Sequence, residues 1–248
     1  MKKYELILVA TADELASHVA GAWLDEVEKS QLSGKPYCVA LSGGRITQKF
    51  FASVEEQART RKIGNGGAPS FPGNVHFFWA DERCVPPDDS ESNFKLADQL
   101  LFRPLKIDQT RIHRIRGEDS PARAVKDAGS ELRQVAGPGE NGQPVLDLIF
   151  LGMGEDGHVA SLFPNAAAEV VNDPGPFLIV KDSPKPPPRR ISLSYASVAA
   201  AREVWVLISG AGKERALRES MDFSGKTPLA RVIQIRQNTR IFSEIRSK

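Results

Sequence analysis

The feature that most constrains the fold of this chain is the apolar run Val145–Leu151, in which valine, leucine, isoleucine and phenylalanine follow one another with one interruption. Such a run is typical of a strand buried on both faces, as in a parallel sheet that helices cover on either side. It leads into Gly152–His158, which holds three glycines, two carboxylates and a histidine. Ligands bind at the carboxyl ends of strands in open α/β sheets, so we expect a functional site at this turn.

Strand-like and helical segments alternate along the rest of the chain, which predicts an α/β fold with a mostly parallel sheet. Thr11 and Glu14 form a capping-box signature before a helical pattern, and Ser120-Pro121 suits a helix start. The other expected strands are Leu6–Ala10, Tyr37–Leu41, Val75–Ala80, Phe177–Val180 and Val204–Ser209, and further helices are expected over Ile46–Arg59, from Ser92, and over Lys213–Met221.

Two segments have the composition of loops, Gly64–Gly73 and Ser183–Arg190. Neither is long enough to separate independent domains, and the sequence contains no internal repeat. We therefore expect a single α/β domain over residues 1–248, with room for a small lobe.

The composition excludes several classes of protein. With 41% hydrophobic and 26% charged residues the chain has the profile of a soluble globular protein, and its 33 basic against 31 acidic residues give no signature for nucleic acid. Acidic residues interrupt the N-terminal apolar run before a signal-peptide core forms, and no window reaches the roughly 18 apolar residues of a membrane span. Cys38, Cys84 and the four scattered histidines have no metal-binding or redox spacing, so we expect a cytoplasmic protein without a metal site.

His158 is the side chain in the glycine-rich turn whose ordinary pKa lies near neutrality, so it suits a general base. Gly152, Gly154 and Gly157 allow positive φ and close approach of a substrate. In the alternative interpretation Asp156 caps a short helix and His158 is exposed by accident. The clustering of these residues favours a catalytic site.

A second glycine turn, Ser42-Gly43-Gly44-Arg45, joins an expected strand to an expected helix. This arrangement presents free backbone N–H groups and the positive end of the helix dipole to an anion. It matches neither the P-loop nor the GxGxxG dinucleotide fingerprint, so a monophosphate is the expected ligand. A plain strand-to-helix turn is an equally good interpretation of this segment by itself.

Charged residues lie next to three further strand-like runs. Asp81-Glu82-Arg83 places two carboxylates and a guanidinium after Val75–Ala80. Asp81 or Glu82 suits a sugar hydroxyl or an arginine, and Arg83 suits a phosphate. Arg190 and Lys213 are further candidates for phosphate binding. Each alone is more often a solvated surface charge, but the topology of a parallel sheet would bring several strand ends to one edge.

Together these motifs resemble those of the 6-phosphogluconolactonase family over nearly the whole chain. The matching segments are Ser42-Gly43-Gly44, Asp81-Glu82-Arg83 with Ser92-Asn93-Phe94, Gly152–Pro164, Arg190–Leu193 and Gly210–Lys213. Two departures are Arg45-Ile46-Thr47, where the family more often has Ser-Thr-Pro, and Val159, where threonine is frequent.

The resemblance implies a three-layer α/β/α sandwich of the Rossmann-related type, shared with glucosamine-6-phosphate deaminase and ribose-5-phosphate isomerase. It also implies hydrolysis of 6-phospho-D-glucono-1,5-lactone in the oxidative pentose phosphate pathway, without a cofactor or a covalent intermediate. His158 would activate water, Asp156 would orient the imidazole or the water, and backbone N–H groups of the turn would stabilise the oxyanion. The expected substrate-binding residues are Ser42, Gly43, Gly44, Arg45, Asp81, Arg83, Gly152, Gly154, Gly157, Arg190 and Lys213.

A phosphorylated sugar lactone is thus the expected partner, with neither nucleic acid nor membrane, and both a monomer and a homodimer remain open. Two alternatives are a deaminase or isomerase of the same fold and a sugar-phosphate sensor. A deaminase or isomerase of the same fold would have a glutamate five residues after the histidine, where this chain has Phe163. A sugar-phosphate sensor would carry a helix-turn-helix and a basic face, for which the first strand starts too early and the net charge of +2 is too small.

Overall fold

A computed structural model describes residues 3–61, 71–139 and 141–246 of the chain. Its central sheet has six parallel strands in the order β1-β9-β8-β5-β2-β3. Their bounds are β1 Glu5–Leu8, β9 Thr239–Ser243, β8 Glu203–Ile208, β5 Leu148–Gly152, β2 Tyr37–Leu41 and β3 Val75–Trp79. The predicted parallel sheet is confirmed, and β5 lies inside it between β2 and β8.

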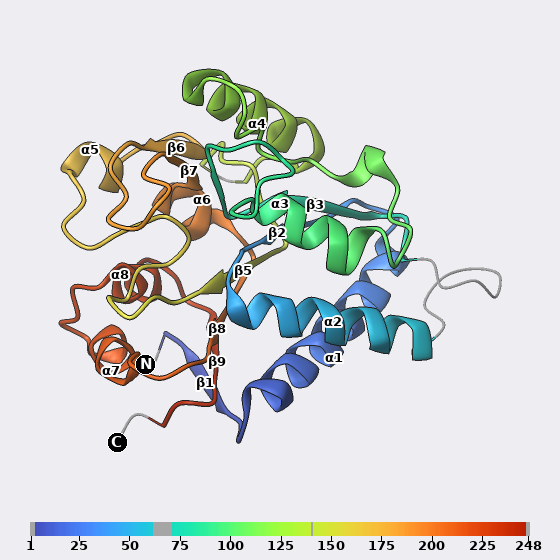
Figure 1. Cartoon of the computed structure of the whole chain (residues 1–248), viewed down its shortest axis with the longest axis horizontal. Coiled ribbons are helices and arrows are strands. Elements are labelled where there is room, and N and C mark those ends of the chain that lie inside the picture. Colours follow the sequence, from blue (N-terminus) through green and yellow to red (C-terminus); the bar gives the residue numbers. More distant parts are fainter. Residues whose placement is uncertain (1–2, 62–70, 140, 247–248) are drawn as a thin grey trace.

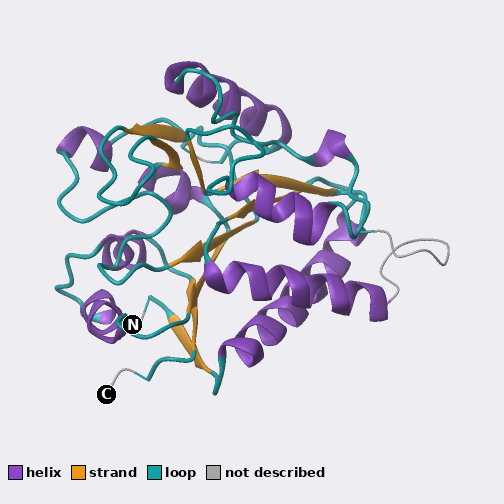
Figure 2. Cartoon of the chain, viewed as in Figure 1, coloured by secondary structure: helices purple, strands orange, loops and turns teal. Residues whose placement is uncertain are grey.

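Helices cover both faces of this sheet, as Figures 1 and 2 show. Helices α1 (Ala12–Ser30) and α2 (Arg45–Arg61) lie on one face, and α7 (Glu214–Met221) and α8 (Pro228–Ile235) lie on the other. Helix α6 (Tyr195–Ala200) contacts α8, and α3 (Asn93–Ala97) continues into a π-helical turn, Asp98–Phe102, that contacts α2. The predicted three-layer α/β/α sandwich is therefore present. Short 3₁₀ turns occur at Gln31–Ser33 and Gln109–Arg111.

A second, antiparallel sheet consists of β4 (Asp81–Arg83), β7 (Arg190–Leu193) and β6 (Phe177–Val180). Helix α4 (Pro121–Val135) packs against β6 and β7, and the short α5 (Ala168–Val171) contacts β6. Strand β4 follows β3 almost directly, so the second sheet lies next to the carboxyl end of β3 (Figure 1). The sequence predicted β6 but not this sheet, since Asp81-Glu82-Arg83 has no apolar alternation and forms a strand only by pairing with β7.

Aromatic side chains join the central sheet to its helices. Trp23 of α1 packs edge-on against Phe150 of β5, with 5.3 Å between the ring centroids, and Phe50 of α2 lies 4.7 Å from the same ring. On the neighbouring strand, Trp205 lies 5.8 Å from Phe150. All four side chains are buried, so the expected burial of the strand after Val145 on both faces is confirmed.

Other differences from the sequence prediction have local causes. Strand β5 begins at Leu148 rather than Val145, because the N–H of Asp147 donates to the carbonyl of Cys38 and its carboxylate accepts from the N–H of Cys38. Strand β9 (Thr239–Ser243) was not predicted, since its sequence is mostly polar. Of the expected loop Gly64–Gly73, residues 64–70 lie outside the described residues.

Among the helices of the three described ranges, none is long and apolar enough to cross a membrane.

Candidate active site

A cavity of about 440 Å³ opens where β2, β5 and β8 end and where the second sheet meets the first. All of the predicted site residues line it except Asp156 and Gly157. The predicted residues on its wall are Ser42, Gly43, Gly44, Arg45, Asp81, Arg83, Gly152, Gly154, His158, Arg190 and Lys213. The convergence of separate strand ends, which sequence could only infer from topology, is therefore present in the structure.

The turn after β5 holds His158 and Asp156 as a pair. The imidazole Nδ1 lies 2.5 Å from Asp156 Oδ1, and the side chain of Asp156 also accepts from the N–H of His158 at 3.3 Å. Gly154 donates its N–H to the carbonyl of His158, and Gly157 donates to the carbonyl of Gly154. These two N–H groups are used inside the turn, so they are not available to an oxyanion.

Gly154 makes room for this pair. A Cβ atom at position 154 would lie 2.1 Å from the His158 ring and 2.7 Å from Asp156 Oδ1. Contacts that short do not occur between real side chains, so any larger residue would displace the imidazole. The role of Gly154 is thus to allow the close approach of His158 to the backbone.

Burial sets the protonation state of the pair. Desolvation lowers the pKa of His158 below its ordinary value, against the opposing effect of the Asp156 carboxylate. Burial disfavours ionisation of Asp156, but its hydrogen bonds with His158 and the charge of His158 leave the pKa of this carboxyl below its usual range. The result at neutral pH is a neutral imidazole that donates from Nδ1 to a carboxylate. Nε2 makes no hydrogen bond within the described residues and is available as a base.

Asp81 lies at the start of β4, with its carboxylate on the same cavity. Its Oδ2 accepts from Ser161 Oγ at 2.6 Å, and Asn93 Nδ2 donates to the Asp81 carbonyl at 2.9 Å. Asn93 also fits closely against Gly43, where a Cβ atom would lie 1.9 Å from Asn93 Oδ1. The carboxylate of Asp81 is therefore held in one orientation near the glycine turn of β2.

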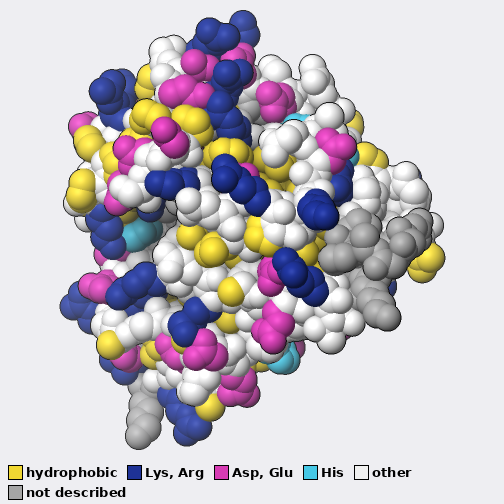
Figure 3. All heavy atoms as spheres, turned by 45° about the vertical axis from the view of Figure 1, so that its right-hand side comes forward, with side chains coloured by type: hydrophobic (Ala, Val, Ile, Leu, Met, Phe, Trp, Pro, Cys, Tyr) yellow, Lys and Arg dark blue, Asp and Glu magenta, His cyan; other side chains and the backbone are white. Residues whose placement is uncertain are grey.

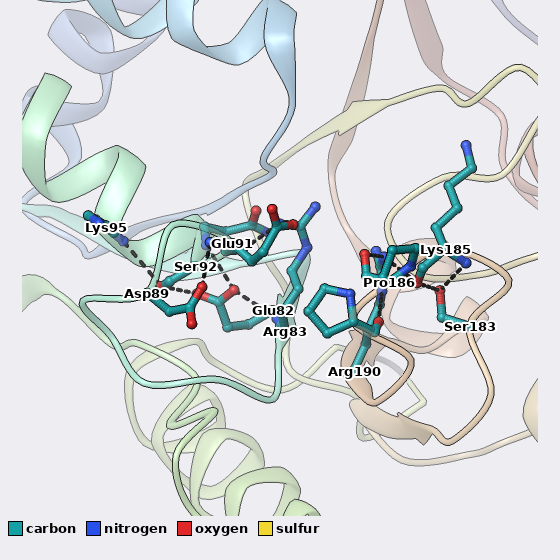
Figure 4. Close-up of polar contacts among 12 residues, drawn as sticks. Glu82, Arg83, Asp89, Glu91, Ser92, Lys95, Ser183, Lys185, Pro186 and Arg190 are labelled. Carbon is teal, nitrogen blue, oxygen red and sulfur yellow. Dashed lines mark hydrogen bonds and ion pairs between the residues drawn. The ribbon is translucent and has the colours of Figure 1, made fainter.

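Glu82 is buried behind the cavity and connects β4 to α3. Its carboxylate accepts from the N–H of Arg83 at 2.7 Å and from Ser92 Oγ at 3.1 Å (Figure 4). It also accepts from the N–H groups of Asn93 and Phe94 at 2.9 and 2.8 Å. Burial raises the pKa of Glu82 to about 7, because desolvation outweighs these hydrogen bonds. Glu82 therefore organises the backbone around Arg83 and Asn93.

Basic side chains outnumber acidic ones on the wall of the cavity. The basic residues are Arg45, Lys49, Arg83, Lys185, Arg190 and Lys213, and the acidic ones are Asp81 and Glu155. Elsewhere, on the face shown in Figure 3, basic and acidic side chains are interspersed. The cavity wall thus carries an excess of positive charge, which suits a small anionic ligand.

Three of these cations have partners in the protein. Lys49 Nζ pairs with Asp13 at 2.5 Å, Arg83 donates to the carbonyl of Glu91, and Arg190 donates to backbone carbonyls of the segment before β7 (Figure 4). Arg45, Lys185 and Lys213 have no ion pair or side-chain hydrogen bond within the described residues. The last three are thus the cations most available to a ligand.

Arg45 and Lys213 lie close together beside the N-terminus of α2. Burial lowers the pKa of Lys213, and the charge of Arg45 lowers it further, which an anion placed between them would relieve. The N–H groups of Gly43 and Gly44 make no hydrogen bond within the described residues, and they precede α2. Ser42, by contrast, donates its hydroxyl to the carbonyl of Phe150 at 2.7 Å and so connects β2 to β5.

Sequence reasoning missed several residues on the cavity wall, among them Lys49, Asn93 and Lys185. Asn93 belongs to the quoted Ser92-Asn93-Phe94 motif, which was a signal for it. Lys185 lies in a proline-rich segment that was interpreted only as a loop. Within the described ranges, no group of three or more His, Cys, Asp and Glu side chains is placed to hold a metal ion.

Fold and cavity together define an α/β protein with a cavity rich in basic side chains at the carboxyl edge of its sheet. Residues 10–242 match the family described as glucosamine-6-phosphate isomerases/6-phosphogluconolactonase, and the chain belongs to this family.

Two relatives illustrate the similarity. The 6-phosphogluconolactonase of Mycobacterium tuberculosis is 39% identical over 198 residues, which cover 72% of this chain and 79% of that protein. The solved structure of 6-phosphogluconolactonase from Trypanosoma brucei superposes with a TM-score of 0.83 at 25% identity, over 98% of this chain and 96% of the other. A monomeric glucosamine-6-phosphate deaminase, 16% identical with a TM-score of 0.77 over 96% of each chain, shares the fold.

Proposed function

We propose that this chain hydrolyses 6-phospho-D-glucono-1,5-lactone to 6-phospho-D-gluconate, the second step of the oxidative pentose phosphate pathway. The observation that carries the proposal is the His158 imidazole, oriented by Asp156 and placed in a cavity lined by cations. The relatives named as 6-phosphogluconolactonases support the choice of substrate.

The mechanism needs only an oriented water and a base. Nε2 of His158 accepts a proton from water as the water oxygen attacks C1 of the lactone, and Nδ1–H remains bonded to Asp156. The carbonyl π bond opens, which places a negative charge on its oxygen. As the tetrahedral intermediate collapses, the C1 carbonyl re-forms, the bond from C1 to the ring oxygen breaks and the imidazolium returns the proton to that oxygen. The resulting C1 carboxylic acid loses its proton to solvent and becomes the carboxylate of 6-phosphogluconate.

The phosphate is assigned to the N-terminus of α2. Gly43 and Gly44, whose N–H groups make no hydrogen bond within the described residues, line the cavity there together with the cations Arg45 and Lys213. Arg83 lies on the same wall, although one of its nitrogens is bonded to the Glu91 carbonyl. Anchoring the phosphate here fixes the lactone relative to His158 and supplies the positioning that the reaction requires.

Phe163 argues against the deaminase or isomerase alternative. It occupies the place of the glutamate that the deaminase uses, and its ring packs 4.7 Å from the His158 ring. An apolar side chain there takes no part in proton transfer but contributes to the burial that keeps His158 neutral. No feature of the described residues favours a sensor over an enzyme.

The proposal also includes a cytoplasmic location and a phosphorylated sugar lactone as the partner. Cys38 and Cys84 are both free thiols, which suits a reducing compartment.

A lactonase assay tests the proposal. The lactone is generated with glucose-6-phosphate dehydrogenase, and its loss is followed above the spontaneous rate with wild type and with His158→Ala. We expect rapid loss with wild type and a decrease on the order of 10²- to 10⁴-fold in the variant, the usual range of general acid–base help. Absence of catalysed loss with pure wild type would contradict the lactonase assignment, and full activity of His158→Ala would contradict the role of the histidine.

A further inference from the structure

The segment between β6 and β7 fixes the backbone of Lys185. The N–H of Lys185 donates to Ser183 Oγ at 3.2 Å, and its carbonyl accepts from Ser183 Oγ at 2.8 Å and from Arg190 Nη2 at 3.0 Å (Figure 4). The N–H of Ser183 in turn donates to the carbonyl of Pro188. These hydrogen bonds therefore fix the loop backbone on both sides of Lys185, which is exposed.

Arg190 is the centre of this arrangement. Its Nε donates to the Pro187 carbonyl and its Nη2 to the Pro186 carbonyl, both at 3.1 Å, in addition to the bond to Lys185. The residue is only 4% exposed, and its guanidinium lies 5.7 Å above the ring of Phe163. The ring of Phe163 also packs against the ring of His158. Arg190 therefore connects the loop, through Phe163, with the histidine.

The ammonium group of Lys185 has no such ties. Within the described residues it makes no ion pair or hydrogen bond, yet the side chain lines the same cavity as His158. Its charge lowers the pKa of both His158 and Asp156, an effect that requires the ammonium to lie near the pair. In Figure 4 the side chain extends away from Arg190, with its nitrogen clear of the loop.

We propose that Lys185 is a substrate-binding residue that contacts the C1 oxygen of the lactone, and that Arg190 is a positioning residue that holds Lys185 there. The inference rests on the proposed lactonase function. As water adds to C1, the ammonium donates a hydrogen bond to the oxygen that becomes negative, and after ring opening it faces the new carboxylate. The glycine N–H groups of residues 154 and 157 cannot serve here, because they are bonded within the turn.

A pair of ligands that differ only at C1 tests the contact. 6-Phosphogluconate carries a C1 carboxylate, whereas glucitol 6-phosphate has a hydroxymethyl group in its place. We expect Lys185→Met to weaken 6-phosphogluconate binding about tenfold or more, as for loss of a charged hydrogen bond, and to leave glucitol 6-phosphate binding unchanged. Lys181→Met removes an exposed lysine from the start of the same loop and should alter neither.

Three outcomes would overturn the contact. If Lys185→Met weakens the binding of both ligands equally, Lys185 contacts the phosphate instead. If it changes the binding of neither, Lys185 does not contact the substrate. If Lys181→Met weakens 6-phosphogluconate binding as much as Lys185→Met does, the effect comes from the overall charge of the protein and not from a contact. The pH profile adds a further readout. Because Lys185 lowers the pKa of His158, Lys185→Met should move the acidic limb of kcat/KM to higher pH.

Arg190→Lys tests the positioning role, since it keeps the charge but loses the three-way bonding to the loop. We expect it to weaken the binding of 6-phosphogluconate selectively, as Lys185→Met does. Thermal unfolding checks that the variant is folded. If the binding of glucitol 6-phosphate weakens to the same degree, Arg190 binds the phosphate directly. The lactonase proposal is tested separately: it fails if wild type does not hydrolyse the lactone, whatever the two ligands show.

Discussion

At the scale of single residues, His158 combines two properties that its neighbours provide. Phe163 and the surrounding burial keep the imidazole neutral, while Asp156 holds Nδ1 and leaves Nε2 available for water. Asp156 itself lies off the cavity wall, so in this mechanism it acts through the histidine rather than on the substrate. The two residues therefore have separable effects on rate and on pH dependence.

Asp156→Asn should change both the rate and its pH dependence. The carboxylate raises the pKa of His158 against the effect of burial, so its removal lowers that pKa further and moves the acidic limb of kcat/KM to lower pH. Loss of the oriented Nδ1–H should also lower the plateau, by up to about 10²-fold, a part of what general acid–base help supplies. The measurement is kcat/KM from pH 4 to 9. A limb that moves to higher pH, or an unchanged plateau, would contradict this role.

At the scale of elements, the turn after β5 depends on the space left at Gly154. Gly154→Ala would push the imidazole away from its position, because its Cβ would lie 2.1 Å from the ring. Misplacement of a catalytic group by about 1 Å costs on the order of 10²-fold in rate, so we expect a loss of that size in kcat. Gly137→Ala is a matched control, since a Cβ there meets no atom within 4 Å. Similar losses in both variants would show that the effect is not specific to the turn.

The elements also show what sequence can and cannot predict. Tyr37–Leu41 and Phe177–Val180 were predicted with the observed bounds, because unbroken apolar runs mark buried strands. Strands β4 and β9 were missed, since their polar residues become strands only through partners distant in sequence. The same limit applies to the site: the motifs gave His158 and the glycine turns, but the bond from Ser161 to Asp81 joins residues 80 positions apart and depends on the tertiary structure.

At the scale of the whole molecule, charge is distributed unevenly. The chain carries a formal net charge of only +2, yet six basic side chains and two acidic ones line a single cavity. Much of the positive potential is therefore concentrated where the sheet ends, and an anion that enters removes repulsion between cations such as Arg45 and Lys213. Ligand binding should accordingly stabilise the fold, and the effect should depend on the phosphate.

Thermal unfolding with two ligands tests this expectation. At a concentration about 100 times its Kd, 6-phosphogluconate should stabilise the protein by about 2.7 kcal/mol and raise Tm by about 5 to 10 °C. Gluconate at the same concentration lacks the phosphate and should leave Tm nearly unchanged, because the cations beside α2 gain no partner. Added salt should reduce the shift with 6-phosphogluconate, since it screens charges at the open cavity. Equal shifts with the two ligands would show that the phosphate is not the anchor, and would move the binding energy from the N-terminus of α2 to the C1 end of the site.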